Sequence, residues 1–468
     1  MASSNTVIIL PGDFPDPTIV RLNDDYYLTH SANVYAPSLL IWHSTDLQRW
    51  SPIGHALNTY DGDIWAPDIS YHDGMFYIYY TTSGRNKVIT ADRPEGPWSE
   101  PVDLNVPHID PGHIVDSDGR RYLYLSGGNV IELASNGLST IGDIKHVYSG
   151  WPVPSSWRIE ATAEEGPKLF WRNGWCYLVT AQGGTAGPST GHMAVVARSR
   201  SALGPWKNCP DNPILRTFSR NERWWCKGHA TILETAEGEW RIVYHAYDNG
   251  YVTLGRHTLL QTIKWTDDDW PYVDDSAELP VPFALPELSD NFEGTALKWQ
   301  WRFASVLDHS RYETGNGVLK LQGLGESAGS SSPLCLLPRD HSYQVTVDVV
   351  VVSASAEAGI LLFYNENFYT GLGLIPQTGV ILRHHHHREP VLQQPTTKAK
   401  LRIVNDEHET DFFVKLEGSE WTRIPRGFDV SGWNHNTICG FLGLRVALYA
   451  AGSGEAQFRN FTYEALHK

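Results

Sequence analysis

Three carboxylic acids stand at points where proline holds the backbone. Asp16 has a proline on either side, Asp110 directly precedes one, and Glu165 is followed by a Gly-Pro pair. Such segments make poor strand interiors. Their presence indicates that the backbone holds each acidic side chain in a particular direction. Two carboxyl groups across a pocket can hydrolyse a glycosidic bond, because one protonates the leaving oxygen while the other activates water. Since Asp-Pro steps are also common in ordinary turns, this chemistry is indicated by the three acids together and by no single one.

A repeated unit indicates how the chain would position these acids. Five times, an acidic or Asn residue, often followed by Gly, leads into an aromatic run: Asp24–Tyr27, Asp73–Tyr77, Asp118–Tyr122, Asn173–Tyr177 and Glu237–Trp240. The anchoring positions 25, 74, 119, 174 and 238 are 45 to 64 residues apart. Several short strands in each period of about 40–50 residues are typical of a β-propeller blade. We predict five blades over residues 6–272, with the three acids at the starts of blades one, three and four, near the central axis.

The remaining pattern is also that of strands. Helical periodicity is almost absent, and aromatic and β-branched runs recur between turn residues, which predicts an all-β protein. We expect a catalytic propeller over residues 1–273, a linker with three prolines over 274–287, and a β-sandwich over 288–468. Residues 457–463 alternate like a half-exposed strand of such a sandwich.

Two segments of the second domain are expected to be loops. Residues Ser327–Ser332 are small and polar and predict a flexible loop. The run His384–His387 resembles a metal-binding tract by composition. Its flanking residues, Arg383 and Arg388, would repel a cation, so a solvated loop is favoured.

Composition excludes several classes of function. The 468 residues include 37 Lys and Arg against 53 Asp and Glu, a formal charge of −16, which argues against a nucleic-acid or anionic-membrane partner. No uncharged apolar stretch is long enough for a membrane span, and the first residues do not resemble a signal peptide. The five cysteines are odd in number and lack metal-ligand spacing. The 18 Trp and 22 Tyr hint at carbohydrate, while compartment and oligomeric state stay open.

A series of motifs in the first domain resembles glycoside hydrolase family 43 over about residues 6–272. In order, they are Phe14–Pro17, Trp65–Asp68, Ile109–Pro111, Glu165–Pro167, Gly183–Thr185, Ala197–Ser199, Lys227–Ala230 and Leu254–Arg256. The resemblance implies a five-bladed propeller and an inverting glycosidase that acts on plant-wall pentosans, with no organic cofactor. The chain from Leu288 resembles the concanavalin-like jelly roll that follows the propeller in several members.

The family resemblance also implies roles for the acids. Asp16 would be the general base and Glu165 the general acid, and Asp110 would orient Glu165 and raise its pKa through like charge. Glu164 is a competing candidate for the acid, but Glu165 directly precedes Gly-Pro as in the family. Inversion needs room for a water, so base and acid should stand about 6.5–9.5 Å apart. Arg256 would donate to a substrate hydroxyl or steady Asp110.

Further residues are expected around the acids. His229 would lie on the axis near a structural Ca²⁺, largely coordinated by water, because a single nitrogen is a poor calcium site. Its alternative is a histidine satisfied by backbone hydrogen bonds. Phe14, Trp65 and Trp225 are candidates for stacking on sugar, and either Trp225 or the adjacent Trp224 would pack internally instead.

The expected substrate is a xylo-oligosaccharide or arabinoxylan. The sequence leaves β-xylosidase and α-L-arabinofuranosidase open, and β-xylosidase is favoured. Gln182 and the segment 33–37 depart from the family pattern near the expected substrate site, so they bear on the linkage cleaved. A non-catalytic sugar-binding propeller would not need the three acids. A WD-type scaffold would need Trp-Asp pairs, which the chain lacks.

Overall fold

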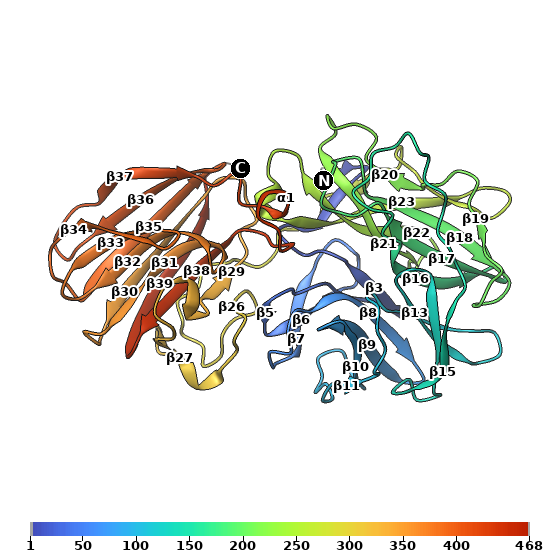
Figure 1. The fold of residues 1–468 in the computed structure, drawn as a ribbon, viewed down its shortest axis with the longest axis horizontal. Helices are drawn as coiled ribbons and strands as arrows, with labels where there is room; N and C mark the ends of the chain where they lie inside the picture. Colours follow the sequence, from blue (N-terminus) through green and yellow to red (C-terminus); the bar gives the residue numbers. More distant parts are fainter. Residues whose placement is uncertain (1–2, 467–468) are drawn as a thin grey trace. The chain divides into compact units, whose positions relative to one another are not determined.

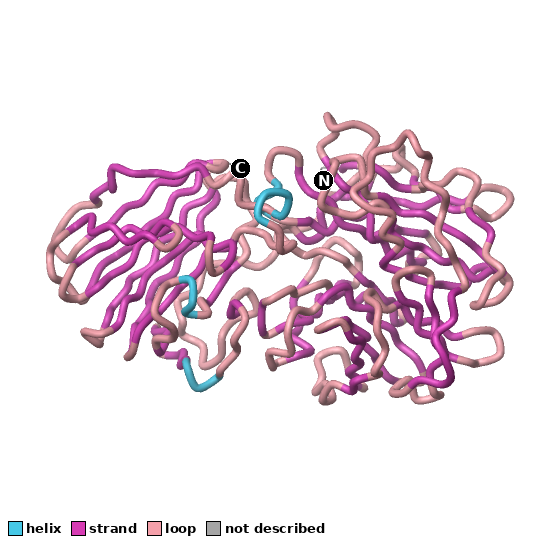
Figure 2. The backbone as a smooth tube through the Cα atoms, in the orientation of Figure 1, coloured by secondary structure: helices cyan, strands magenta, loops and turns pink. Residues whose placement is uncertain are grey.

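The computed structural model describes residues 3–466 and divides them into two units (Figure 1). The first unit runs to Val34 and continues over Ser38–Gly250 and Arg256–Leu285. The second holds the short segments Tyr35–Pro37 and Tyr251–Gly255 and the described chain from Pro286 onward. Strands dominate both units, and helix is confined to short turns, so the all-β prediction is confirmed (Figure 2).

The first unit is a five-bladed propeller, as predicted. Blades one and two each have four strands: β3 (Thr18–Leu22), β4 (Asp25–Thr29), β6 (Ser38–Ser44) and β7 (Ser51–Leu57), then β8 (Trp65–His72), β9 (Met75–Thr82), β10 (Arg85–Ala91) and β11 (Val102–Asp103). Blade three has β12 (Gly112–Val115), β13 (Arg121–Leu125), β14 (Asn129–Leu133) and β15 (Thr140–His146). Blade four has β16 (Glu165–Arg172), β17 (Trp175–Gln182), β18 (Met193–Ser199), β19 (Lys207–Asn208) and β20 (Leu215–Arg216).

Blade five joins the two ends of this unit. It contains β21 (Trp224–Glu234), β22 (Trp240–Asp248), β23 (Arg256–Trp265) and β24 (Pro271–Val273), and the N-terminal strand β2 (Val7–Leu10) pairs with β23. Strand β1 (Ser3–Ser4) pairs with β25 (Leu279–Pro280), which lies inside the predicted linker. The ring is therefore held by hydrogen bonds between the beginning and the end of the propeller chain.

The repeated turn of the sequence is the hairpin between the first and second strand of each blade. Asp73-Gly74 and Asn173-Gly174 join β8 to β9 and β16 to β17, and all four residues have positive φ. This is the backbone of a two-residue hairpin whose twist matches its strands, and it favours Asn, Asp and Gly. Apolar clusters fill the spaces between successive blades from one to five and hold the sheets side by side.

The second unit contains two large antiparallel sheets. One comprises β5 (Tyr35–Ala36), β26 (Arg302–Ala304), β29 (Leu334–Leu336), β31 (Ala356–Asn365), β32 (Phe368–Ile375), β33 (Gly379–His384), β34 (His387–Leu392) and β38 (Arg445–Gly452). The other comprises β27 (Tyr312–Gly315), β28 (Val318–Gln322), β30 (Tyr343–Val351), β35 (Lys398–Asp406), β36 (Glu409–Lys415), β37 (Thr422–Asp429) and β39 (Glu455–Ala465). The predicted strand at 457–463 is confirmed as part of β39.

Two loop predictions for this unit need correction. Ser327–Ser332 contains a 3₁₀ turn, η3 (Gly329–Ser331), and Ser331 is fully buried, so the segment is packed. In the histidine run, a turn forms at His385 and His386, and His386 and His387 are exposed as expected, but His384 ends β33 and lies flat against the ring of Phe428, with centroids 3.8 Å apart. Aromatic packing against this neighbour, which the local sequence does not reveal, makes His384 part of the sandwich structure.

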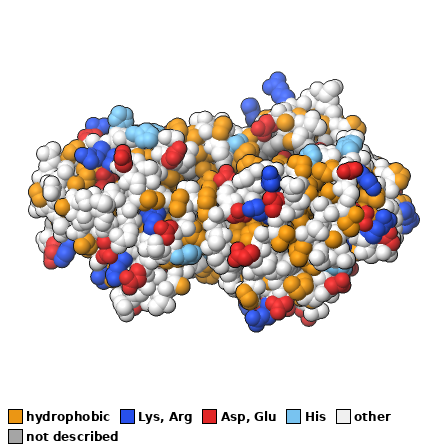
Figure 3. All heavy atoms as spheres, turned by 60° about the horizontal axis from the view of Figure 1, so that its bottom comes forward, with side chains coloured by type: hydrophobic (Ala, Val, Ile, Leu, Met, Phe, Trp, Pro, Cys, Tyr) orange, Lys and Arg blue, Asp and Glu red, His pale blue; other side chains and the backbone are white. Residues whose placement is uncertain are grey.

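The surface carries both signs of charge. On the face drawn in Figure 3, acidic and basic side chains are interspersed, without an extended patch of one sign. Within residues 3–466, no helix is long and apolar enough to cross a membrane.

Candidate active site

Each inner strand of the propeller has a residue in an unusual backbone conformation, which lies at or near the start of the strand in blades one to four and within β21 in blade five. In blade order, the residues with positive φ are Asp16, Ala66, Asp110, Gly166 and His229, with φ of 56°, 32°, 60°, 58° and 50°. Four of the five are not glycine, and this left-handed conformation strains any other residue. Strand pairing shifts register here in blades two, four and five. In each blade, the backbone at this residue departs from regular strand geometry.

Direct contacts link these five positions into one cluster. The Ala66 N–H donates to Ser31 Oγ at 2.6 Å, and Ser31 Oγ donates to Asp16 Oδ2 at 2.6 Å. Asp16 Oδ1 lies 3.4 Å from His229 Nδ1. The Gly166 N–H donates to Asp110 Oδ2 at 3.0 Å. A Cβ on Gly166 would stand 2.7 Å from His229 Nε2, so glycine is required for this close approach.

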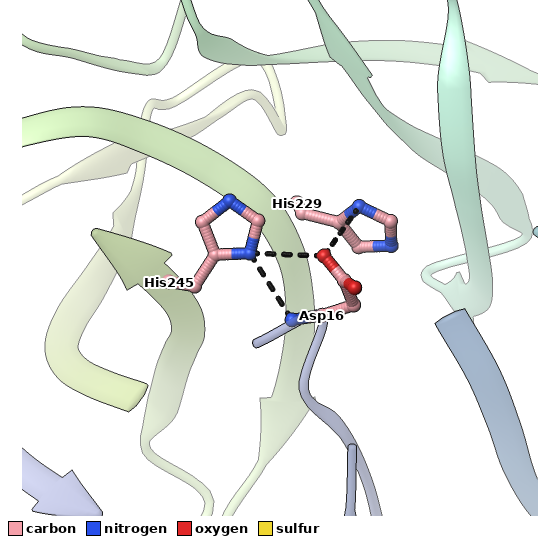
Figure 4. A group of neighbouring side chains, drawn as sticks. All are labelled: Asp16, His229 and His245. Atoms are coloured by element: carbon pink, nitrogen blue, oxygen red, sulfur yellow. Dashed lines mark hydrogen bonds and ion pairs between the residues drawn. The ribbon is translucent and has the colours of Figure 1, made fainter. Parts of the chain in front are cut away.

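Asp16 lies in a setting that favours its charged form. Arg256 Nη1 donates to Asp16 Oδ1 at 2.9 Å, and both residues are buried. His245 Nδ1 accepts a hydrogen bond from the Asp16 backbone N–H at 3.1 Å and lies 3.1 Å from Asp16 Oδ1 (Figure 4). Burial alone would raise the pKa of Asp16, but the Arg256 guanidinium and the neighbouring imidazoles hold it well below the usual value.

His245 is a neutral imidazole in this arrangement. Its Nδ1 accepts from Asp16 N, and its Nε2 lies 3.2 Å from Thr185 Oγ1, to which it can donate. Burial lowers the pKa of His245, which agrees with the neutral form. The Asp16 carboxylate is therefore fixed by a guanidinium and a hydroxyl, while the imidazole of His245 holds the Asp16 backbone N–H.

The other two acids are in the opposite electrostatic setting. Oxygens of Asp110 and Glu165 and a nitrogen of His229 all lie within 4.8 Å of one another. Burial, together with the charge of Asp16, raises the pKa of Asp110 to about 7. Burial and then the charge of Asp110 raise the pKa of Glu165 well above its usual value. One acid of the cluster is thus ionised at neutral pH, while another holds a proton.

The competing candidate, Glu164, lies outside this cluster. Burial raises the pKa of Glu164 to about 8, but no neighbouring charge contributes to that shift. The side chain of Glu165 meets Asp110 and His229, whereas that of Glu164 belongs to neither group of carboxyls and imidazoles. The geometry therefore favours Glu165.

Arg256 contacts a different acid from the one predicted. The sequence suggested that it would steady Asp110 or donate to substrate, but its guanidinium donates to Asp16. The reason is the position of Arg256 at the start of β23, beside residues 13–16: its backbone N–H also donates to Asp13 Oδ1 at 3.2 Å.

A buried ion pair close to the acids was not predicted. Lys168 Nζ donates to Asp68 Oδ1 at 2.9 Å and to the carbonyl oxygens of Pro67 and Pro111 at 2.9 and 3.2 Å. The pair joins blades two, three and four, and Lys168 lowers the pKa of the neighbouring Asp110. Lys168 follows Glu165-Gly166-Pro167 directly, a proximity that could have drawn attention to it.

The three aromatic candidates behave differently. Trp65, at the start of β8, is 40% exposed and can offer a ring face. Trp225 is partly exposed, while Trp224 packs in the core between blades four and five. Phe14 is 3% exposed and packs edge-on against His30 and Trp42, so its ring is covered and its predicted stacking role is not supported.

Gln182, which departs from the family pattern, does not lie where the sequence suggested. Gln182 is fully buried, and its side-chain amide accepts from the Trp151 N–H at 2.8 Å and donates to the Trp151 carbonyl at 3.1 Å. It anchors the segment that precedes Glu165 instead of facing substrate. Of the segment 33–37, Tyr35–Pro37 belongs to the second unit.

A five-bladed propeller whose axial acids differ in protonation has the groups that a glycoside hydrolase needs for acid–base catalysis. The family model described as Glycosyl hydrolases family 43 matches residues 6–271, more than half of the chain. The chain belongs to this family, whose enzymes invert the configuration of the sugar they release. A second model, described as Beta xylosidase C-terminal Concanavalin A-like domain, matches residues 289–464. The predicted jelly roll is therefore confirmed.

Named relatives extend over nearly the whole chain. A Beta-xylosidase of Bacillus subtilis is 32% identical and is covered over 98% of its length, with 97% of this chain. A Non-reducing end alpha-L-arabinofuranosidase of Bacteroides ovatus is 27% identical, with 96% of this chain and 91% of the relative covered. Among solved structures, the Bacillus licheniformis GH43 protein BlXynB superposes with a TM-score of 0.88 at 29% identity, covering 98% of this chain and all of BlXynB.

Proposed function

We propose that the protein releases pentose units from xylan-type oligosaccharides, with β-xylosidase as its main activity. One observation carries the proposal: Asp16 favours its ionised form while its axial neighbour Glu165 favours its protonated form. Inverting hydrolysis needs this pair of states at the same pH. The named relatives include xylosidases that are covered over nearly their full length.

Asp16 serves as the general base in this proposal. Arg256 and Ser31 each donate to one of its carboxylate oxygens, which fixes the plane of the carboxylate and keeps it charged. The Asp16 carboxylate removes a proton from a water as that water attacks the anomeric carbon. Because Arg256 is committed to Asp16, we assign it to positioning the base and not to contact with a sugar hydroxyl.

Glu165 serves as the general acid and donates its proton to the leaving oxygen. Asp110 keeps that proton on Glu165 through like charge, and the Gly166 N–H holds Asp110 in place. The exposed ring of Trp65 and the partly exposed ring of Trp225 are the proposed stacking platforms for sugar.

A panel of aryl glycosides tests the proposal directly. We expect the purified protein to hydrolyse a β-D-xyloside faster than an α-L-arabinofuranoside, an α-L-arabinopyranoside or a β-D-galactoside. Asp16→Asn should abolish this activity while the melting temperature stays close to that of the wild type. Wild-type protein that binds xylo-oligosaccharides but hydrolyses none of these substrates, nor arabinoxylan, would instead identify a carbohydrate-binding propeller.

The alternative activity is that of an α-L-arabinofuranosidase on arabinoxylan or arabinan. It is supported by the Bacteroides ovatus relative, which carries that name and matches 96% of the chain. A higher kcat/KM on the α-L-arabinofuranoside than on the β-D-xyloside would establish it.

We also propose a structural Ca²⁺ beside His229, held largely through water. His229 Nε2 is buried and has no hydrogen-bond partner among residues 3–466, and Asp110 and Glu165 each place a carboxylate oxygen within 4.8 Å of a His229 nitrogen. Burial lowers the pKa of His229 to about 3, so its ring is neutral and can bind a water of the ion. Such an ion would supply positive charge at the axis. Removing divalent ions with a chelator should lower the melting temperature, and Ca²⁺ should restore it more effectively than Mg²⁺.

A further inference from the structure

Two loops of the propeller present aromatic and basic side chains together. The loop over residues 147–164 leads into Glu165 and carries Trp157 and Arg158, while residues 217–223 carry Phe218 and Arg220. The loops meet at Arg216, whose guanidinium lies 3.3 Å from the centroid of the Trp157 ring. We call Trp157, Arg216 and Phe218 the aromatic shelf.

Phe218 is the exposed part of the shelf. Its side chain is 72% exposed, the largest value among the exposed large hydrophobic residues of the described chain. A fixed turn presents it, because the N–H groups of Phe218 and Ser219 both donate to Glu222 Oε1, at 2.7 and 2.9 Å. The other oxygen of Glu222 pairs with Lys227 Nζ at 2.9 Å. An exposed aromatic ring on a turn fixed in this way can stack on the apolar face of a sugar.

Arg216 is a cation without an acid. It is 8% exposed, its Nε donates to the Thr190 carbonyl at 3.1 Å, and within residues 3–466 it forms no ion pair. Burial lowers its pKa, with no carboxylate nearby to offset the effect. The neighbouring Arg158 and Arg220 are exposed and likewise form no ion pair within the described chain. Three arginines without an ion pair thus lie in or beside these two loops, in a protein whose formal charge is −16.

Two chains of contacts connect the shelf to the catalytic cluster, one to the base and one to the acid. Thr190, whose carbonyl accepts from Arg216, lies in the loop 183–192, and Thr185 of the same loop contacts His245, which lies beside the base Asp16. Glu160, three residues after Trp157, is held by Gly183 and Ala186 of that loop, and its charge contributes to the raised pKa of the acid Glu165. A general acid protonates the leaving oxygen, so the part of the substrate beyond Glu165 is the leaving group.

We propose that the aromatic shelf is a leaving-group subsite that selects a uronic-acid-bearing sugar, with Phe218 stacking on the ring and Arg216 binding the carboxylate. The inference rests on the proposed pentosidase function and adds the chemical class of its leaving group. An arginine fork binds a carboxylate through two parallel hydrogen bonds, and such charge-assisted bonds are stronger than those to a sugar hydroxyl.

The test compares two xylo-oligosaccharides of equal length, one unsubstituted and one with a glucuronic acid on the leaving-group portion, beside an aryl β-D-xyloside. We expect wild-type protein to have a higher kcat/KM on the acidic oligosaccharide and to lose this preference in about 0.5 M NaCl. Arg216→Gln should reduce the ratio of acidic to neutral kcat/KM by about tenfold. Arg216→Lys, which keeps the charge but loses the fork, should retain part of it.

Phe218→Ala removes an exposed ring and should raise KM for both oligosaccharides while the protein stays folded. Its matched control is Phe283→Ala, because Phe283 is another exposed ring, 44% exposed, with an arginine, Arg49, 4.2 Å from its centroid. The control should leave the oligosaccharide KM values as in the wild type.

The outcomes separate the two proposals. Hydrolysis of the aryl xyloside with equal kcat/KM on both oligosaccharides would overturn the shelf while the pentosidase function stands. An acidic preference that is unchanged in Arg216→Gln would also overturn it. A protein inert on all three substrates would overturn both proposals together.

Discussion

The propeller and the sandwich both bury carboxyl groups, but they treat them in opposite ways. In the sandwich, Glu357 receives Arg383 Nε on one oxygen at 2.8 Å, Arg383 Nη2 on the other, and the Tyr449 hydroxyl at 2.7 Å. In the propeller, Asp110 receives the Gly166 N–H, and no ion pair within residues 3–466 reaches Asp110 or Glu165. The sandwich acid is matched by a cation, whereas the two propeller acids have raised pKa values.

The difference shows how a buried carboxyl group that takes part in proton transfer can be told from one that stabilises the fold. Removing one partner from a paired buried charge leaves the other uncompensated, so such pairs matter for stability. Buried acids without a cation keep their protons near neutral pH, which makes them useful for proton transfer. Burial alone does not distinguish the two roles, but the partners of each carboxyl group do.

The largest effect is expected from the two proposed proton-transfer groups. Asp16→Asn should lower kcat by about 10³-fold on every substrate, because no other group can activate the water. Glu165→Gln should do the same on oligosaccharides but much less on an aryl glycoside whose leaving group needs no proton. Steady-state rates on an oligosaccharide and a dinitrophenyl glycoside measure the split. Equal losses on both substrates in Glu165→Gln would contradict its role as the acid.

The matching change in the sandwich should act on stability instead. Glu357→Gln leaves the buried Arg383 without a counter-charge and should lower the free energy of unfolding of the second unit by about 3 kcal/mol. Denaturant unfolding followed by spectroscopy measures this loss. The activity per folded molecule should equal that of the wild type. A large fall in kcat would contradict the claim that this carboxyl group acts only on stability.

The close approach of Gly166 to His229 predicts a smaller effect on activity. Gly166→Ala places a Cβ 2.7 Å from His229 Nε2 and should lower kcat by about 10²-fold through displacement of the acid cluster. Gly74→Ala is the matched control, since Gly74 also has a left-handed φ, of 82°, but its Cβ would meet nothing within 4 Å. A kcat of Gly166→Ala that equals the kcat of Gly74→Ala would contradict the role of this contact in positioning the acids.

Asp110→Asn should shift the pH dependence of the reaction. Loss of the Asp110 charge lowers the pKa of Glu165, so Glu165 loses its proton at lower pH and the alkaline limb of kcat/KM moves downward. The acidic limb, which reports ionisation of Asp16, should move less. An alkaline limb that stays in place would contradict the coupling between the two acids.

The same variant should become relatively more stable as pH rises. Folded Asp110 has a pKa of about 7, above its unfolded value, so the wild type loses stability as pH rises towards 7 while Asp110 gives up its proton. Asp110→Asn lacks this titration. Its unfolding free energy relative to the wild type should therefore increase between about pH 4 and pH 7. A constant difference across this range would contradict the raised pKa.

The sequence was most informative where structure repeats. The Asp-Gly and Asn-Gly turns revealed the blade period, because a two-residue hairpin restricts its residues strongly. The prolines beside Asp16 and Asp110 marked these two positions because proline also restricts the backbone strongly. His245 could not be singled out, since it lies on β22 of blade five and meets Asp16 only when the ring closes. Ser31 reaches Asp16 from the end of the first hairpin of blade one, and no local motif marks it. The burial of Phe14 likewise depends on His30 and Trp42, which its local motif does not contain.

The left-handed residue that each blade carries, near the start of its inner strand or within it in blade five, has a consequence for how this scaffold could acquire other activities. Each blade contributes one backbone position that turns toward the same small volume, whatever side chain it bears. Here the five positions hold two aspartates, an alanine, a glycine and a histidine, so two of them contribute no functional group of their own. New chemistry could arise by exchanging residues among equivalent sites of a rotationally repeated frame, without rebuilding any strand. Blade two, where Ala66 already adopts the required conformation next to the exposed Trp65, is the position most open to such a change.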